Sequence, residues 1–241
     1  SPLENHGDIG GVKVRPTFRA DQRFKENAAK SELEKRLDYF VEKGCKIADY
    51  GFDFIDEADE NLAWLIENCY KRKMILQLHF GTYRNVNSAA YGQCGKDSGF
   101  DIMRGAIDTD KLVKILDREN VRLGGLPKIV VYPLNDYDLR ALGALTGAFS
   151  SVKLGAAWWF NDTVNGIKRQ METAAEYSAL GTQYGMLTDS RSFSSYVRFD
   201  FYRRILASFI GEKAENGEYD EAAAIALARK IAYENIKAAL L

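Results

Sequence analysis

The chain has almost no net charge and few cysteines. Its 241 residues carry 33 Lys and Arg against 34 Asp and Glu, for a formal charge of −1. This balance offers no overall field for nucleic acid or for an anionic membrane, so we expect neither as a partner. The three cysteines, Cys45, Cys69 and Cys94, form no Cys-x-x-Cys or Cys–His spacing. They predict reduced thiols in a cytoplasmic protein rather than a disulfide scaffold.

Long apolar runs are also missing. No stretch approaches the roughly 18 apolar residues of a membrane span, and residues 1–11 lack the basic-then-apolar order of a signal peptide. The chain does have 46% hydrophobic and 12% aromatic residues. That content supplies a sizeable core for one domain of α/β-barrel size, so we expect a cytoplasmic globular protein that is not exported.

Apolar, β-branched segments alternate with helical patterns along the chain. Strands are expected at residues 12–18, 45–50, 74–80, 128–134, 152–160 and 184–188. Helices are expected at residues 28–43, 57–72, 108–119, 136–149, 163–180, 194–210 and 219–240. Gly44 is expected to end the first helix, and Asp136 or Asp138 to cap the fourth. The alternation predicts an α/β fold with a parallel sheet and right-handed crossovers, as in a TIM-barrel-like (β/α) fold.

Polar or aromatic residues follow each expected strand. They are Arg19, Asp49, His79 with Arg84, Asn135, Trp158 with Trp159, and Asp189 with Arg191. Parallel barrels carry their chemistry at the C-terminal ends of the strands, so these residues are candidates for a site. A closed barrel has eight strands, and only six are expected here. The sequence therefore predicts a single, partial β/α-barrel domain over residues 1–241.

Two of these strand ends carry groups that can move protons or bind metal. His79 can ligate a metal or transfer protons near neutral pH, but a hydrogen-bonded structural histidine fits equally well. Asp189 and Arg191 leave their strand together, which suits a metal ligand or a general base, or a simple structural ion pair. Sequence alone leaves both choices open.

Other residues suggest ligand binding. Arg19 suits capture of a carboxylate, or is a solvated surface residue. Trp158 and Trp159 either pack in the core or form the wall of a sugar pocket. Residues 81–107, rich in Gly, Asn and Ser, are far longer than the usual βα connection of about 2–6 residues and predict a substrate loop or a disordered insertion.

Four motifs together resemble the uronate isomerase (glucuronate isomerase) family of the amidohydrolase superfamily. They are VRPTFRAD at residues 14–21, QLHFGTYRN at 77–85, LGAAWWFND at 154–162 and GMLTDSRSF at 185–193. They follow the family's order over nearly the whole chain. The resemblance implies aldose–ketose isomerisation of hexuronates, D-glucuronate to D-fructuronate and D-galacturonate to D-tagaturonate, in a homo-oligomeric TIM barrel with one divalent metal, commonly zinc.

The resemblance also implies residue roles. Asp189 would ligate the metal and shuttle a proton, Arg191 would polarise the substrate, and His79 would lie near the metal as a second ligand. Substrate binding would fall to Arg19, Arg84, Trp158 and Trp159. Chemically, a proton moves between adjacent carbons while a metal or another cation stabilises the enediolate oxygens.

The chain departs from the family's pattern in ways that affect the metal. Its histidines are His6 and His79, so the His-x-His pair of the family's first strand has no counterpart. Asp49-Tyr50 stands where the family usually has Asp-His, and Phe199 stands at a commonly basic position. The expected strands correspond to the third to eighth of the barrel. We therefore expect weak or absent zinc binding by this chain.

Two other functions stay open. The first is a non-catalytic or truncated relative that retains a sugar-acid pocket without metal. The second is a metal-dependent hydrolase on the same barrel.

Overall fold

The structure is a computed structural model that describes residues 10–52, 55–56, 59–96, 98–189 and 192–240. It divides into two compact units, Ser1–His79 with Asp108–Val130, and Phe80–Ile107 with Val131–Leu241. Strand β6 passes from the first unit into the second, and so does the end of β3.

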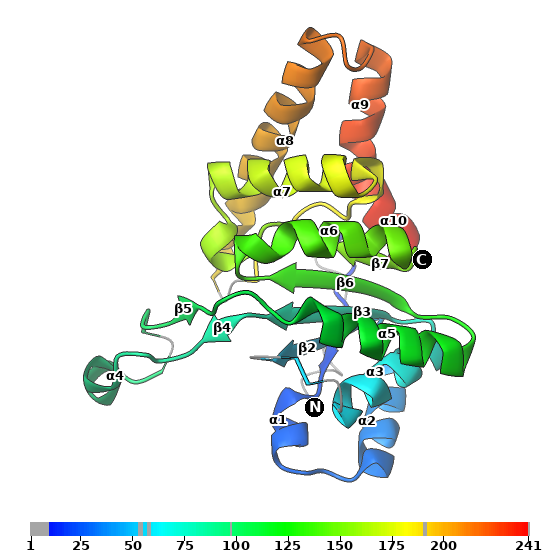
Figure 1. Cartoon of the computed structure of the whole chain (residues 1–241), viewed down its shortest axis with the longest axis vertical. Helices are drawn as coiled ribbons and strands as arrows, with labels where there is room; N and C mark the ends of the chain where they lie inside the picture. The colour runs from blue at the N-terminus through cyan, green and yellow to red at the C-terminus, as the bar shows by residue number, and fades with distance from the viewer. Residues whose placement is uncertain (1–9, 53–54, 57–58, 97, 190–191, 241) are drawn as a thin grey trace. The chain divides into compact units, whose positions relative to one another are not determined.

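The first unit carries a mostly parallel sheet in the order β1-β2-β3-β6 (Figure 1). Its strands are β1 (Thr17–Arg19), β2 (Ile47–Phe52), β3 (Ile75–Phe80) and the first half of β6 (Lys128–Pro133). Its helices are α1 (Asp21–Lys25), α2 (Lys30–Glu42), α3 (Glu60–Lys71) and α5 (Thr109–Leu123). The expected alternation of strands and helices is therefore confirmed in this unit.

Helix α3 shows why these segments fold as they do. The Asp59 side chain caps it by accepting hydrogen bonds from the backbone N–H groups of Asn61 and Leu62, at 2.9 and 3.0 Å. Leu62, Leu65, Ile66 and Cys69 follow the helical period and are buried. Similar local rules hold for α2, where Gly44, at φ +85°, ends the helix as expected.

The second unit contains the rest of β6, the strand β7 and most of the helices. Its elements are β4 (Thr82–Tyr83), α4 (Ser88–Cys94), β5 (Ile102–Met103), η2 (Asp136–Asp138), α6 (Leu139–Ala148), β7 (Val152–Leu154), η3 (Trp159–Asn161), α7 (Val164–Tyr177), η4 (Leu180–Thr182), η5 (Phe193–Tyr196), α8 (Val197–Glu215), α9 (Glu221–Arg229), η6 (Lys230–Glu234) and α10 (Asn235–Leu240). Helices α8 and α9 run side by side (Figure 1). Met171, Tyr202 and Phe209 are among the buried residues of its core.

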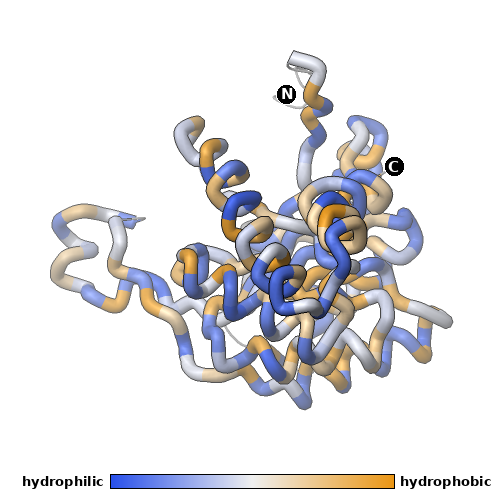
Figure 2. The backbone as a smooth tube through the Cα atoms, turned by 90° about the horizontal axis from the view of Figure 1, so that it is seen from above, coloured by the Kyte–Doolittle hydropathy of each residue, from blue (hydrophilic) through white to orange (hydrophobic). Residues whose placement is uncertain are grey.

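Apolar residues occur in short stretches along the backbone (Figure 2). Among the described residues, no helix combines the length and the apolar character that crossing a membrane requires. Cys45 and Cys69 are buried and Cys94 is exposed, and all three are free thiols.

The structure corrects the expected strand at residues 184–188. This segment is irregular and joins no sheet. Gly185 has φ +74°, and a Cβ there would lie 2.7 Å from the Ile231 carbonyl oxygen. A positive φ breaks the pleat of a strand, so close packing on the backbone at Ile231 replaces strand pairing. Five of the six predicted strands form.

Three further expectations need correction. The strand expected over residues 152–160 ends at Leu154, so Trp158 and Trp159 lie beyond it. Asn135 caps the fourth predicted helical segment, through a 3.0 Å hydrogen bond from Tyr137 N–H, instead of Asp136 or Asp138. The Asp138 carboxylate accepts from Ile107 N–H. The described part of the long connection at residues 81–107 contains β4, α4 and β5, so the alternative of a disordered insertion was wrong, and the substrate loop stays a prediction.

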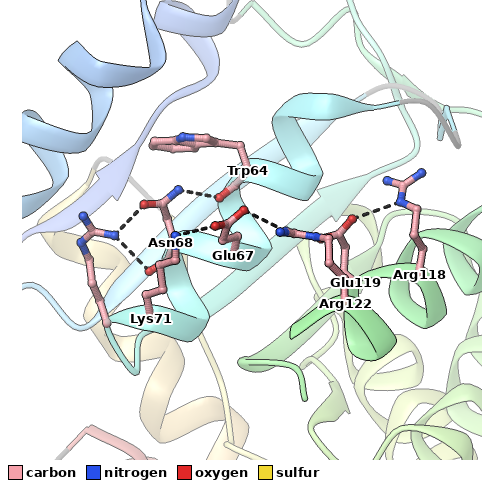
Figure 3. Close-up of polar contacts among 8 residues, drawn as sticks. Trp64, Glu67, Asn68, Lys71, Arg118, Glu119 and Arg122 are labelled. Carbon is pink, nitrogen blue, oxygen red and sulfur yellow. Dashed lines mark hydrogen bonds and ion pairs between the residues drawn. The ribbon is translucent and has the colours of Figure 1, made fainter. Parts of the chain in front are cut away.

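Helices α3 and α5 are joined by an ion-pair network (Figure 3). The Glu67 carboxylate accepts from Lys71 and, at 2.8 Å, from Arg122, which also donates to the buried Glu119 at 2.8 Å. Arg118 donates to Glu119 at 3.0 Å. Hydrogen bonds from Lys71 and Arg122 hold the pKa of Glu67 below its ordinary value. The pairs of Glu67 with Lys71 and Arg122 therefore stabilise the fold most while Glu67 is charged.

We expect Glu67→Gln to make the free energy of unfolding fall less steeply as the pH is lowered. The lowered pKa of Glu67 means that its contribution is present above its unfolded pKa and is lost as pH falls through the folded value. Urea denaturation at pH 7 should show a loss of about 0.5–1 kcal/mol in the variant, and the difference from wild type should shrink toward pH 3. A loss that stays constant with pH would contradict this account.

Gly166→Ala should destabilise the start of α7. A Cβ at this position would lie 2.0 Å from the backbone oxygen of Asn161, which cannot move aside like a side chain. We expect a loss of about 1–3 kcal/mol in the free energy of unfolding. Gly147→Ala in α6, where a Cβ meets nothing within 4 Å, is the matched control and should be neutral or stabilising by up to about 1 kcal/mol. Equal effects of both changes in chemical denaturation would refute the steric reason.

Candidate active site

The first unit brings together three candidate residues at the ends of adjacent strands. Arg19 ends β1 and is the register partner of Asp49 in β2, and His79 lies near the end of β3. Arg19 Nη1 lies 3.4 Å from Asp49 Oδ2, and His79 Nδ1 lies 2.7 Å from Asp49 Oδ1. Asp49 therefore stands between a guanidinium and an imidazole, and we call these residues the Arg19–Asp49–His79 cluster.

The cluster is partly closed to solvent. The side chains of Asp49 and His79 are 11% and 12% exposed, while that of Arg19 is 57% exposed. The Asp49–His79 contact is short, at 2.7 Å. A carboxylate at Nδ1 orients the imidazole, and an oriented imidazole can exchange a proton with a ligand. This arrangement suits general acid–base chemistry.

A second carboxylate fixes Arg19. Its Nε donates to Asp21 Oδ2 at 2.7 Å, and the other oxygen of Asp21 accepts from Gly51 N–H at 3.4 Å. Asp21 thus ties the end of β1 to β2. Arg19 is held in place by two acidic groups, so it is not a freely solvated surface arginine.

The first unit also contains a cavity of about 750 Å³, whose lining includes Asp21 but none of the three residues of the cluster. Asp21, Gly51 and Tyr50 are among its lining residues. Tyr50 donates to Asp59 Oδ2 at 3.2 Å, and burial together with the charge of Asp59 raises the pKa of its hydroxyl, so Tyr50 stays protonated at neutral pH. The volume falls within the usual range for small-molecule sites, about 300–1,000 Å³.

The second unit brings together Trp158 and Asp189. Trp158 is buried and its Nε1 donates to Asp189 Oδ2 at 2.9 Å. Trp159 is 37% exposed. Both Trp159 and Asp189 have positive φ, at 52° and 44°. Such backbone strain in residues with a side chain tends to gather at functional sites, because the surrounding structure must hold it.

Arg84 also belongs to this second group. Its guanidinium carbon lies 4.8 Å from the centre of the Trp159 ring, a cation–π distance. Its Nη1 donates to Asp101 Oδ2 at 2.9 Å. Of the predicted site residues, Arg84, Trp158, Trp159 and Asp189 are therefore linked within one unit, by contacts from one to the next.

The two predicted metal ligands, His79 and Asp189, belong to different units. His79 belongs to the first unit and Asp189 to the second, and Arg191 lies outside the described residues. Within the described part of the chain, no three or more His, Cys, Asp or Glu side chains are placed to hold a metal ion. A catalytic zinc takes about three protein ligands, so the described residues do not fit that metal.

Sequence reasoning missed Asp21 and Asp101 as site residues, and it missed the partners of Asp49. Asp49 was recognised as a strand end but not as the partner of Arg19 and His79. Asp21 follows Arg19 by two residues, a spacing that could have pointed to a pair. Asp101 lies seventeen residues after Arg84, and only the tertiary structure shows its contact.

Comparison with known proteins places the chain in a family. The profile of the glucuronate isomerase family matches residues 58–239. The chain belongs to this family. It is 36% identical over 221 residues to uronate isomerase of Serratia proteamaculans, covering 77% of this chain and 47% of that protein. It is 32% identical over 265 residues to uronate isomerase of Yersinia enterocolitica, covering 86% and 56%.

Solved structures confirm the fold. Uronate isomerase from Thermotoga maritima matches with a TM-score of 0.87 and 24% identity, covering 97% of this chain and 63% of that one. Glucuronate isomerase from Caulobacter crescentus matches with a TM-score of 0.84 and 22% identity, covering 99% and 60%. This glucuronate isomerase family member spans about half the length of the curated relatives it matches.

A double-mutant cycle should show that Asp49 and His79 act as a pair. We expect the effects of Asp49→Ala and His79→Ala on the free energy of unfolding to be non-additive, with a coupling energy of about 1–2 kcal/mol. Either single change already removes the contact, so the second change cannot remove it again. Urea denaturation of the four proteins measures it. Asp117→Ala, an exposed change in α5, combined with His79→Ala is the control and should be additive within about 0.5 kcal/mol. A coupling as small as that of the control would refute the pairing.

Proposed function

We propose that the chain forms part of an aldose–ketose isomerase of hexuronates, converting D-glucuronate to D-fructuronate and D-galacturonate to D-tagaturonate. The observation that carries this proposal is the Arg19–Asp49–His79 cluster, built on three adjacent strand ends in a member of the glucuronate isomerase family. The relatives that bear the name uronate isomerase support the same substrate class.

The chemistry assigns each group a task. Isomerisation moves a proton from the hydroxyl-bearing carbon C2 to the carbonyl carbon C1, while the proton of the C2 hydroxyl passes to the C1 oxygen. His79, oriented by Asp49, is proposed to carry the carbon-bound proton. Arg19, a partly exposed cation held between Asp49 and Asp21, is proposed to bind the substrate. In the second unit, Asp189 is the proposed second proton carrier, and Arg84, Trp158 and Trp159 are proposed to hold the sugar acid.

The finer fold assignment belongs to the same proposal. The strands would be the third to seventh of a (β/α)₈ barrel, with the irregular segment at residues 184–188 in the place of the eighth. The strand order and the likeness to uronate isomerase structures support this. With that segment counted, the chain would supply six of the eight βα repeats, in a single partial barrel domain.

Divalent metal remains a prediction from the resemblance. When bound, such an ion would polarise the substrate oxygens. The described residues do not supply its ligands, so the steps proposed above use only the chain's own side chains.

The poor fit to a metal favours a second candidate function for this chain on its own. In this alternative it binds sugar acids without turning them over. The stacked Arg84–Trp159 pair and the cavity beside Asp21 are features that such binding would use.

Assays of the purified chain decide between these functions. We expect D-glucuronate and D-galacturonate to be converted to their ketoses, followed by NMR, with metal content measured alongside. His79→Gln should lower the rate by at least about 100-fold because the proton carrier is lost. Arg19→Met should weaken binding by more than about tenfold because a charged contact is lost. Arg36→Met, in an exposed position of α2, is the matched control and should change neither.

Binding of hexuronate without ketose formation and without metal would favour the binding function. Absence of both binding and turnover would contradict both proposals. Turnover that is unaffected by His79→Gln would refute the role of His79.

A further inference from the structure

The connection that follows β3 is closed by a short hairpin. Strand β4 pairs with β5 in antiparallel register, Thr82 with Met103 and Tyr83 with Ile102. Val86 N–H donates to the Phe100 carbonyl at 2.8 Å. Figure 1 shows this hairpin leading out to α4. Arg84 directly follows β4 and Asp101 directly precedes β5, so both lie at the end of the hairpin that faces α4 along the chain.

Asp101 holds both the side chain of Arg84 and the backbone next to it. Its Oδ2 accepts from Arg84 Nη1 at 2.9 Å, and its Oδ1 accepts from Asn85 N–H at 2.7 Å. The Asp101 side chain is only 7% exposed, whereas that of Arg84 is 49% exposed. Asn85 has φ +54°, a left-handed conformation that needs support from its surroundings. One buried carboxylate therefore fixes the course of the backbone and the direction of the guanidinium.

The other contact of Arg84 is an aromatic face. Its guanidinium lies over Trp159, whose ring centre is 5.6 Å from that of Trp158. Trp158 in turn donates to Asp189. Asp101 thus holds the first member of a series of contacts that runs from Arg84 through Trp159 and Trp158 to Asp189.

We propose that Asp101 is a positioning residue, which aims the Arg84 guanidinium at the carboxylate of the hexuronate. The proposal rests on the substrate class proposed above. A guanidinium has five N–H donors, so one that donates to Asp101 can still bind a second carboxylate in bidentate fashion. A half-exposed arginine without such an anchor would lose side-chain entropy on binding, and an anchored one has already lost it.

The substitution Asp101→Asn separates positioning from a purely structural role. The Asn oxygen can still accept from Asn85 N–H and preserve the hairpin, while the amide NH₂ placed toward Arg84 cannot accept from it. We expect the backbone amide resonances of residues 82–86 and 100–104 to keep their dispersion. The Arg84 guanidinium N–H signal should broaden and exchange faster with solvent. Affinity for D-glucuronate should fall by at least about tenfold, because a preorganised charged contact is lost.

Two further variants complete the test in the full chain. Arg84→Ala should lower the affinity for D-glucuronate at least as much as Asp101→Asn, and adding Asp101→Asn to it should bring no further loss, because Asp101 acts through Arg84. Asp200→Asn is the matched control. It removes an exposed carboxylate from a surface pair with Arg204, and should leave both affinity and the Arg84 signal unchanged.

The outcomes keep the two proposals apart. An Arg84 signal unaffected by Asp101→Asn overturns the positioning role, and so does a further loss of affinity in the Arg84→Ala background. If the wild-type chain binds no hexuronate, the proposed function fails, while a loosened Arg84 in Asp101→Asn still supports Asp101 as its positioning residue. Binding that is weakened by Arg84→Ala but not by Asp101→Asn refutes this inference and leaves the proposed function standing.

Discussion

Parallel pairing of neighbouring strands is the constraint on which the first unit depends. The register that aligns Thr17 with Ile47 also aligns Arg19 with Asp49, so two strand ends with opposite charges must meet. His79 reaches the same carboxylate from β3. A slip of one residue would turn every side chain to the other face and take this cluster apart. The buried residues of β1, β2 and β3 maintain this register, and the geometry of the cluster depends on it.

In the second unit, the candidate side chains are held in place by contacts beyond the strands and not by strand register. Here the strands are short and the candidate residues lie beyond them: Trp159 begins η3, and Trp158 and Asp189 lie in irregular backbone. Trp159 and Asp189 adopt positive φ, and the hydrogen bond from Trp158 to Asp189 and the contact of Trp159 with Arg84 hold them. Backbone strain of this kind costs roughly 1–3 kcal/mol per residue. The adjacent core, which contains Ala157 and buried residues of α7 and α8, offsets this cost.

Expectations from sequence succeeded where a local rule operates. Apolar periodicity located five strands and the principal helices, and the glycine rule ended α2 at Gly44. They failed where a distant contact overrides the pattern. The apolar run at residues 184–188 has strand composition, yet Gly185 packs on the backbone of Ile231. Asp138, a good capping residue by type, turns instead to the Ile107 amide, and Asn135 takes the cap.

The sequence by itself determined the α/β alternation, the strand ends that carry Arg19 and His79, and membership of the glucuronate isomerase family. These follow from periodicity and from motifs of neighbouring residues. Only the tertiary structure decided which partners those residues have. Asp49 lies thirty residues from both Arg19 and His79, and Asp101 lies seventeen residues from Arg84. Contacts across such distances arise from strand register and from the fold of a long connection, which no local pattern of residue types encodes.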